Sequence, residues 1–174
     1  MNATLAGHPV QGEVLVRPLL GHEQLAAQAM FTLGVAKASQ SQHRMAEAWF
    51  DQCTALQPDY SDAWANLASA RDNQGMAHEA NQAWLRCALT YYHKRELPQA
   101  LKLLQQVLAR APGYMDAYID IAAVLEELHQ PAESMRYAVM LLKALQATVP
   151  SLPAVLAMLP ENLQVLEAAP LKPE

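Results

Sequence analysis

The chain has 174 residues, which is enough for one domain with a sizeable core and too few to favour two large domains. Apolar residues make up 52% of it, charged residues 17%, and the formal net charge is −5. Because nucleic-acid binding relies on clustered Lys and Arg that displace counterions, this charge argues against a nucleic-acid partner.

Residues 1–22 are predicted to form a flexible or loosely packed N-terminal arm, because Pro9, Pro18 and several glycines occur there without a period. The arm has no basic start, and polar residues such as His8 and Gln11 interrupt its apolar stretch, so it does not resemble a signal peptide. No window of the sequence approaches ~18 uninterrupted apolar residues. We therefore expect a cytoplasmic protein with no membrane insertion.

Residues 23–147 are predicted to form an array of helices. Ala and Leu, both strong helix formers, are the most frequent residues, and no strand-like alternation stands out. Helix breakers separate segments of about 13–18 residues, a normal helix length for such arrays. The breakers fall at 39–41, 57–59, 73–75, 93–98, 111–113 and 129–131.

The same side-chain types return in the same order along these helices. The first-helix set Trp64, Leu67, Ala68 and Arg71 matches Met30, Leu33, Gly34 and Lys37, and also Tyr118, Ile121, Ala122 and Leu125. The second-helix set Ala46, Phe50, Cys53 and Pro58 matches Ala100, Leu104, Val107 and Pro112, and Ala80, Trp84 and Cys87 match all but the proline.

This pattern resembles the tetratricopeptide repeat (TPR) family, whose signature combines a large residue, a Leu and a small residue in the first helix with Ala, Phe and Pro in the second. The resemblance covers about residues 27–147 of the chain. It implies an all-α fold, an α-solenoid of antiparallel helix hairpins that serves for protein binding.

The spacing of the first-helix anchors departs from the family period. Met30, Trp64, Trp84 and Tyr118 are separated by 34, 20 and 34 residues. If Trp84 serves as the second-helix residue of one repeat and the first-helix residue of the next, the array has seven helices in place of eight. This interpretation predicts a phase break near residues 93–98. The alternative is that Trp84, Tyr91 and Tyr92 simply make one second helix unusually aromatic.

Residues 148–174 are rich in proline, and Ser151 and Pro160 can each begin a short helix. Arrays of this kind need a final element over their last apolar face, so one or two capping helices are predicted here. The alternative is a mobile tail that carries a short apolar motif for another protein.

The residues needed for catalysis are present without the spacing that catalysis needs. The six histidines are spread along the chain, and Cys53 and Cys87 occupy small interior positions of the repeat. Asp116 and Asp120 are four residues apart, which is also typical of a solvated helix face. The sequence therefore predicts no enzyme activity, no cofactor and no metal site.

In the family that the chain resembles, first helices line a concave groove in which peptides lie. By register, the groove of this chain is lined by Phe31, Val35, Asp62, Ala65, Asn66, Ser69, Asp72, Asn73, Leu85, Arg86, Leu89, Tyr92, Asp116, Ile119, Asp120, Ala123, Glu126 and Glu127. Some family members hold a terminal carboxylate with lysines, asparagines and an arginine, and of these only one asparagine and the arginine have counterparts here, Asn66 and Arg86. The predicted groove combines apolar side chains with carboxylates instead.

The leading hypothesis is an adaptor or scaffold that binds a peptide segment of a protein partner with apolar and basic residues. One alternative is a small acidic secretion chaperone that holds a hydrophobic export substrate. A second alternative is a regulatory subunit of an enzyme. A homo-oligomer is compatible with all three.

Overall fold

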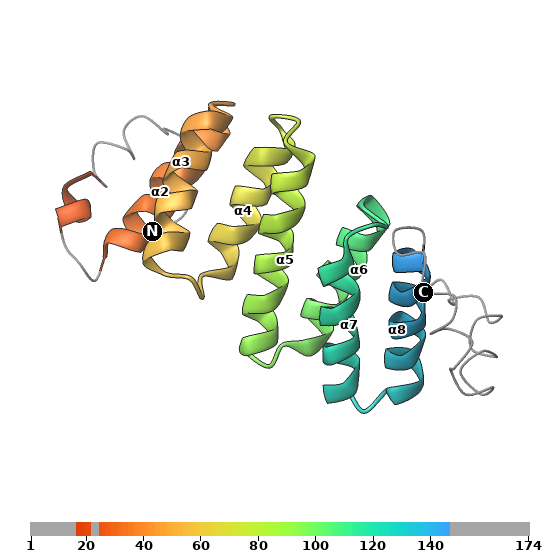
Figure 1. Ribbon diagram of the computed structural model, residues 1–174. Helices are drawn as coiled ribbons and strands as arrows, with labels where there is room; N and C mark the ends of the chain where they lie inside the picture. Colours follow the sequence, from red (N-terminus) through yellow and green to blue (C-terminus); the bar gives the residue numbers. More distant parts are fainter. Residues whose placement is uncertain (1–16, 22–24, 147–174) are drawn as a thin grey trace. The chain divides into compact units, whose positions relative to one another are not determined.

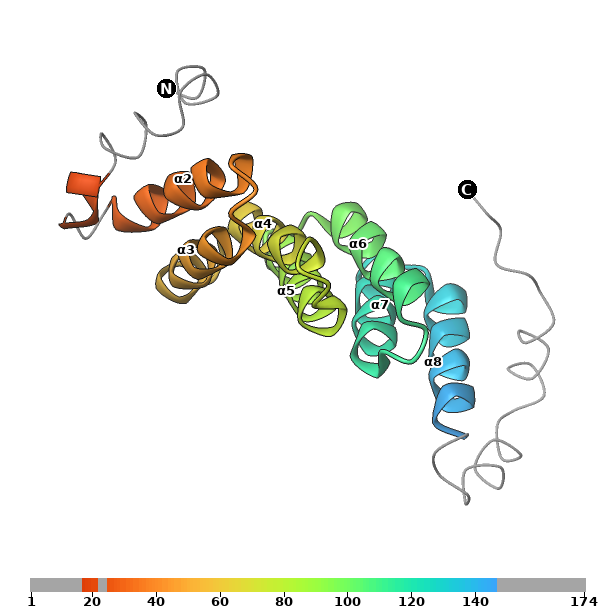
Figure 2. The ribbon, with the colours of Figure 1, turned by 90° about the horizontal axis from the view of Figure 1, so that it is seen from above.

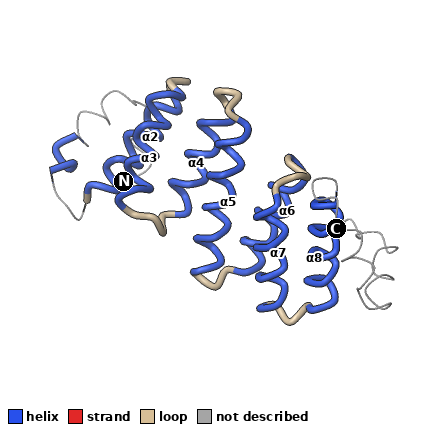
Figure 3. Tube along the Cα trace, viewed as in Figure 1, coloured by secondary structure: helices blue, strands red, loops and turns tan. Residues whose placement is uncertain are grey.

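The computed structural model of the chain describes residues 17–21 and 25–146, and every regular element in these residues is a helix (Figures 1 and 3). The elements are η1 (Arg17–Gly21), α2 (Ala26–Ser39), α3 (His43–Leu56), α4 (Ser61–Asp72), α5 (Ala77–His93), α6 (Leu97–Arg110), α7 (Met115–Glu127) and α8 (Pro131–Gln146). The chain divides into two compact units, Met1–Arg95 (unit 1) and Glu96–Glu174 (unit 2).

Short connections make neighbouring helices within each unit antiparallel. In unit 1, α2 packs against α3, α4 packs against α5, and α3 joins the two hairpins by packing on α4. In unit 2, α7 and α8 form a hairpin, and α6 packs on α7 as α3 packs on α4 (Figure 2). The predicted all-α, TPR-like arrangement of helix hairpins is confirmed, and so is the number of seven array helices.

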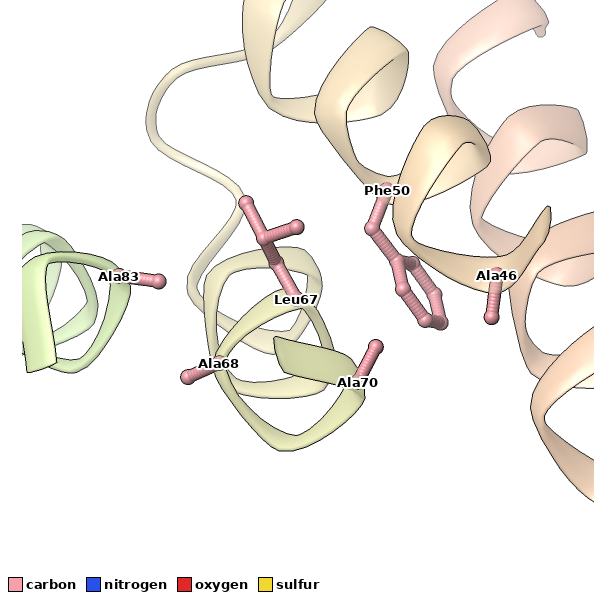
Figure 4. Close-up of a cluster of buried hydrophobic side chains, with 6 residues drawn as sticks. All are labelled: Ala46, Phe50, Leu67, Ala68, Ala70 and Ala83. Carbon is pink, nitrogen blue, oxygen red and sulfur yellow. The ribbon is translucent and has the colours of Figure 1, made fainter. Parts of the chain in front are cut away.

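Small residues let these helices approach closely. A cluster in unit 1 consists of Ala46, Phe50, Leu67, Ala68, Ala70 and Ala83, all at most 2% exposed. In Figure 4 the Phe50 ring points from α3 toward α4, while Ala83 faces α4 from α5. On the other side of Phe50 lies Gly34 of α2, where an added Cβ would come within 2.5 Å of the ring. The glycine therefore makes room for the aromatic side chain.

The turns inside hairpins share a left-handed residue. Gly75, between α4 and α5, has φ 76°, and Ser41 and His129 occupy the same place in the other two hairpins with φ 58°. In the α4–α5 turn the backbone N–H of Met76 donates to the carbonyl of Arg71 at 3.0 Å, the bond expected of a helix that ends in the left-handed region.

The turns between hairpins are built differently. Each contains a proline, and the aromatic anchor of the next helix binds its carbonyl. The indole Nε1 of Trp64 donates to the Pro58 carbonyl at 2.8 Å, and the Tyr118 hydroxyl donates to the Pro112 carbonyl at 2.9 Å. These two bonds give the anchors a second role, in which they fasten the connection between successive repeats.

The turn from α5 to α6 belongs to the first type. Arg95 has φ 65°, and Glu96, which precedes α6, has φ −89° and ψ 60°. Met76, which precedes α5, is similar, with φ −85° and ψ 64°, whereas Tyr60, before α4, has ψ 86°. Helix α5 is therefore both entered and left through turns that elsewhere join the two helices of a hairpin. The two turns that flank α5 are thus of one type, and the sharing of α5 by two repeats stays a prediction.

A pair of matched variants tests the left-handed turn. A Cβ at Gly75 would meet nothing within 4 Å, so the only cost of Gly75→Ser is its backbone conformation. We expect this variant to lower the free energy of unfolding by about 1–2 kcal/mol. The reverse change in the equivalent turn, Ser41→Gly, is expected to leave it unchanged or raise it by up to about 1 kcal/mol. Urea unfolding followed by tryptophan fluorescence measures both, and equal stability of Gly75→Ser and wild type would contradict the argument.

Two predicted segments extend beyond the described residues. Of the predicted arm 1–22, only residues 17–21 are described, and they form η1, which packs against α2. The predicted capping helices or tail at 148–174 lie outside the described residues altogether.

Candidate functional site

The two cysteines are held as packing residues. Cys53 donates from Sγ to the Ala27 carbonyl at 3.2 Å, and Cys87 makes the corresponding bond to the Ser61 carbonyl at 3.4 Å. Burial raises the pKa of the Cys53 thiol to about 11 and that of the Cys87 thiol to about 12. Since the thiolate is the reactive form, neither group is suited to act as a nucleophile or metal ligand.

These pKa shifts predict a loss of stability at high pH. A thiol whose pKa is raised on folding contributes stability that is complete below its unfolded pKa of ~9 and is lost as the pH rises through the folded value. The double variant Cys53→Ala/Cys87→Ala lacks both groups. Between about pH 8 and about pH 10, we expect the wild type to lose more free energy of unfolding than this variant. Parallel losses in urea titrations of the two proteins would contradict the assignment.

In the part of the chain that the structure describes, no three His, Cys, Asp or Glu side chains come together as metal ligands. None of the described helices combines the length and apolar character required to cross a membrane.

The predicted groove residues of unit 1 lie on α2, on α4 and the residue that follows it, and on α5. On α2, Phe31 is half-buried against the rings of Phe50 and Tyr60, at centroid distances of 5.9 and 4.9 Å, and Val35 is 40% exposed. Phe31 is therefore mainly a packing residue. Val35 is an exposed apolar side chain that a ligand could contact.

The α4 residues of the predicted groove form a polar stripe whose donors are turned inward. The side-chain amide of Asn66 donates to the backbone carbonyl of Asp62 at 2.8 Å, and the Ser69 hydroxyl donates to the backbone carbonyl of Ala65 at 3.0 Å. The side-chain amide of Asn73 donates to the backbone carbonyl of Ser69 at 2.9 Å. Because the nitrogen of each amide faces the helix backbone, its oxygen remains the outer atom. The α4 stripe therefore offers mainly hydrogen-bond acceptors.

Asp72 and the α5 residues differ from the prediction. Asp72 accepts a hydrogen bond from Nε1 of Trp84 at 3.2 Å, so its carboxylate helps to join α4 and α5. Leu85 was predicted to line the groove, but it is only 8% exposed and belongs to the core. Leu89 and Tyr92 are half-buried, and of the four predicted α5 residues only Arg86 is exposed. We therefore leave Leu85 out of the candidate surface.

The clearest candidate surface is one face of α7, which we call the α7 face. Ile119 lies on it and is 55% exposed, the same fraction as Met45, and no other exposed large apolar side chain of the described residues exceeds it. Acidic and small side chains share this side of the helix, at Asp116, Asp120, Ala123, Glu126 and Glu127. The helix contains no Lys or Arg. An exposed isoleucine beside several carboxylates suits a ligand with an apolar anchor and positive charges.

The acidic residues of α7 also stand where helix stability disfavours them. Glu126 and Glu127 occupy the last turn, where the helix dipole favours cations and where this helix has no basic residue. Each costs about 0.3–1 kcal/mol in such a position. Their presence is thus better explained by solubility or by a ligand than by the helix itself.

The repeat register did not draw attention to a second group of exposed apolar side chains. Met45 and Leu56 of α3 are 55% and 49% exposed. They lie on second-helix positions that the family pattern does not assign to a groove. A comparison of the second helices with one another would have found them, because the other second helices are more polar there.

No protein-family model matches the chain, and no curated protein matches it. Several solved structures align with it. MamA residues 41–end from Desulfovibrio magneticus RS-1 aligns at 13% identity and a TM-score of 0.41, covering 82% of this chain and 88% of that one. YrrB, described as a TPR protein with an unusual peptide-binding site, aligns at 12% identity and a TM-score of 0.39, covering 89% and 87%.

A third alignment is to the APC/C hetero-tetramer Cut9-Hcn1, at 14% identity and a TM-score of 0.44, and it covers 81% of this chain and 30% of that one. All three TM-scores are below 0.5, so the fold assignment rests on the chain's own helix hairpins and turns. On those features, the chain has the fold of a TPR-like helical repeat.

Proposed function

We propose that the protein is a non-enzymatic interaction module that binds a segment of a protein partner through the α7 face. The observation that carries this proposal is the exposure of Ile119 among carboxylates. An exposed apolar residue that can be buried on binding is the usual anchor of an interface, and its charged rim sets the choice of partner. The partner segment therefore carries an apolar side chain flanked by Lys or Arg.

Two features support an adaptor or scaffold over an enzyme. The surface is a helix face with a single apolar centre, and the two cysteine thiols are buried, hydrogen-bonded and held in the protonated form. An adaptor needs only complementarity of shape and charge, which the α7 face supplies. The acceptor-rich α4 stripe is a separate polar surface of unit 1, and Val35 lies on the neighbouring helix α2.

The test is a comparative capture from lysate with three forms of the full chain: wild type, Ile119→Arg and Met135→Arg. Met135 is an apolar residue of the same unit, 38% exposed on α8, and serves as the matched control. We expect proteins that are retained by the wild type and by Met135→Arg but are lost from Ile119→Arg. Several cytosolic partners would favour the adaptor, whereas one secreted partner would favour the secretion chaperone.

The carboxylates provide a second prediction for any partner found in this way. Asp116→Asn combined with Glu126→Gln removes two charges from the rim and leaves Ile119 in place. We expect the association rate at low salt to fall by about two- to tenfold, with a smaller change in the dissociation rate. The salt dependence should weaken in parallel. Stopped-flow or biosensor kinetics measure both, and an unchanged association rate would show that the rim does not face the partner.

A further inference from the structure

The exposed residues of α7 form a single line along the helix, which we call the α7 line. They are Asp116, Ile119, Ala123 and Glu126, and every other residue of α7 is buried or half-buried. Their spacing of three, four and three residues keeps them on one side of the helix. The line is about 15 Å long, at 1.5 Å per residue. It therefore has a carboxylate at each end and an apolar middle.

The middle of the α7 line offers no group that could hold the backbone of an extended peptide. Such peptides owe much of their affinity to main-chain hydrogen bonds. Helix α7 contains no Asn, Gln, Ser or Thr, and its one hydroxyl group, that of Tyr118, donates to the Pro112 carbonyl. Three backbone carbonyls of its last turn accept hydrogen bonds from the turn that follows. An extended segment that crosses Ile119 and Ala123 therefore finds no amide or hydroxyl group there to bind its backbone.

We propose, as an extension that rests on the proposed function, that the partner segment is an amphipathic helix lying along the α7 line. A helix satisfies its own backbone hydrogen bonds, so it needs only side-chain contacts from α7. Its residues recur at the same spacing and rise, so four of them face the line within about 15 Å. An extended chain places a side chain on one face about every 6.8 Å, so only about three fit this length.

The two middle residues of the line suit the packing of one helix on another. Ile119 is a large side chain that is 55% exposed, and Ala123, one turn further on, is small. Helices pack by fitting the large side chains of one into the gaps on the surface of the other. Phe50 of α3 fits against Gly34 of α2 in this way. The partner helix therefore places a large apolar residue over Ala123 and leaves room for Ile119.

The two ends of the line select basic residues. Asp116 and Glu126 are exposed, and the helix contains no Lys or Arg. The negative end of the α7 dipole lies on the side of Glu126 and adds to its charge. Asp120 and Glu127 are half-buried beside the line and make the same side of the helix more negative. The partner helix therefore carries two Lys or Arg residues about ten positions apart, one for each end of the line.

A second copy of the chain is a poorer occupant of the line. In a symmetric pair of α7 helices, antiparallel packing sets Asp116 of one copy opposite Glu126 of the other, and parallel packing sets each acidic residue opposite itself. Both arrangements bring like charges together, which disfavours the contact. The partner is therefore a different helix, of opposite charge.

The probe is a synthetic peptide of about 18 residues in an alanine and glutamine background. It has lysine at its fourth and fourteenth positions and leucine at its seventh and eleventh, so these side chains share the spacing of the line. Since a free helix of this length is only marginally stable, binding to the full chain is expected to raise the helical circular dichroism above the sum of the components. A second peptide has proline at its ninth position, on the opposite side, which breaks the helix and keeps the four side chains. We expect it to bind at least about tenfold more weakly, as measured by fluorescence anisotropy.

Two matched variants of the full chain test the close packing of the helices. Ala123→Gln enlarges the small residue of the line, and Ala109→Gln makes the same change at an exposed alanine of α6 in the same unit. We expect Ala123→Gln to weaken binding of the helical peptide at least about fivefold and Ala109→Gln to leave it unchanged. Glutamine has a good helix propensity, and circular dichroism checks that both variants keep their helices.

Three results would overturn the helical partner: no binding of the helical peptide, equal affinity of the two peptides, or equal affinity of Ala123→Gln and wild type for the helical peptide. Equal affinity of the two peptides would favour an extended segment. A dimer of the free chain in sedimentation that Ile119→Arg dissociates would overturn it in favour of a second copy. The proposed function is tested separately, because it fails only if proteins captured by the wild type are also captured by Ile119→Arg.

Discussion

Replacing Gly34 with alanine is expected to lower the free energy of unfolding of unit 1 by about 1–3 kcal/mol, the usual cost of overpacking a core. Helix propensity alone predicts the opposite, because alanine is favoured over glycine inside a helix by about 1 kcal/mol. The space around Gly34 decides which of these two effects on the free energy of unfolding is larger. The new methyl group would lie 2.5–2.9 Å from three carbon atoms of the Phe50 ring.

The Phe50 ring has little freedom to move away. Its side chain is completely buried, and it packs among Leu67, Ala68 and Ala70 as well as against Phe31. If the Phe50 ring moves away from the new methyl group on α2, it therefore comes too close to the side chains of α4. All three tryptophans of the chain lie in unit 1, so urea unfolding followed by their fluorescence measures the effect on this unit.

A double variant supplies the control. Phe50→Leu removes the ring atoms that approach Gly34 and is itself destabilising, because it leaves space in the core. In this background Gly34→Ala is expected to become neutral or stabilising, so the two substitutions should be strongly non-additive. If Gly34→Ala has the same effect in both backgrounds, the close approach of α2 to the Phe50 ring is not what requires the glycine.

Replacing Ile119 with arginine is expected to weaken partner binding at least about thirtyfold, which corresponds to a loss of about 2 kcal/mol or more, the loss typical of an interface anchor. The apolar side chain is 55% exposed in the free protein and can gain burial only in a complex. Arginine would add a positive charge beside the carboxylates that we expect to face Lys or Arg of the partner. Like charges across an interface cost further binding energy.

The fold should tolerate this variant. A residue that is more than half exposed contributes little to the core, and arginine has a good helix propensity. We therefore expect the helical circular dichroism and the unfolding midpoint of Ile119→Arg to match those of the wild type within experimental error. Ile119→Leu is the conservative control and should retain binding. Full affinity of Ile119→Arg for a partner captured by the wild type would exclude the α7 face.

The helices and their ends could be predicted from the sequence because each is set by local residues. Pro58 and Pro112 end second helices, and Gly75 supplies the left-handed residue of a turn. The spacing of the anchors also predicted the number of helices, since one shortened step of the repeat can be accommodated only by losing or sharing a helix. In the same kind of turn, Arg95 takes a left-handed conformation that its side chain gives no reason to expect.

The surface could be predicted only in part. Register placed Ile119 on an open face, because a helix position fixes the direction of its side chain. It failed for Leu85, which lies on α5, where the two alternative repeat assignments give the same residue opposite environments. The register also could not predict the hydrogen bonds that the side chains of Asn66 and Asn73 make to the helix backbone. A side-chain amide can donate either to a carbonyl of its own helix or to a ligand, and the sequence does not distinguish the two.

The similar turns on either side of α5 have a consequence for how such proteins can lengthen. The turn before α5 contains Gly75 and the turn after it contains Arg95, and both residues have a left-handed backbone conformation. If one type of turn can join any two successive helices, an array can gain or lose a single helix. A deletion of one helix and its turn would then produce an array with an odd number of helices. Families counted only in whole pairs would overlook members that arose in this way.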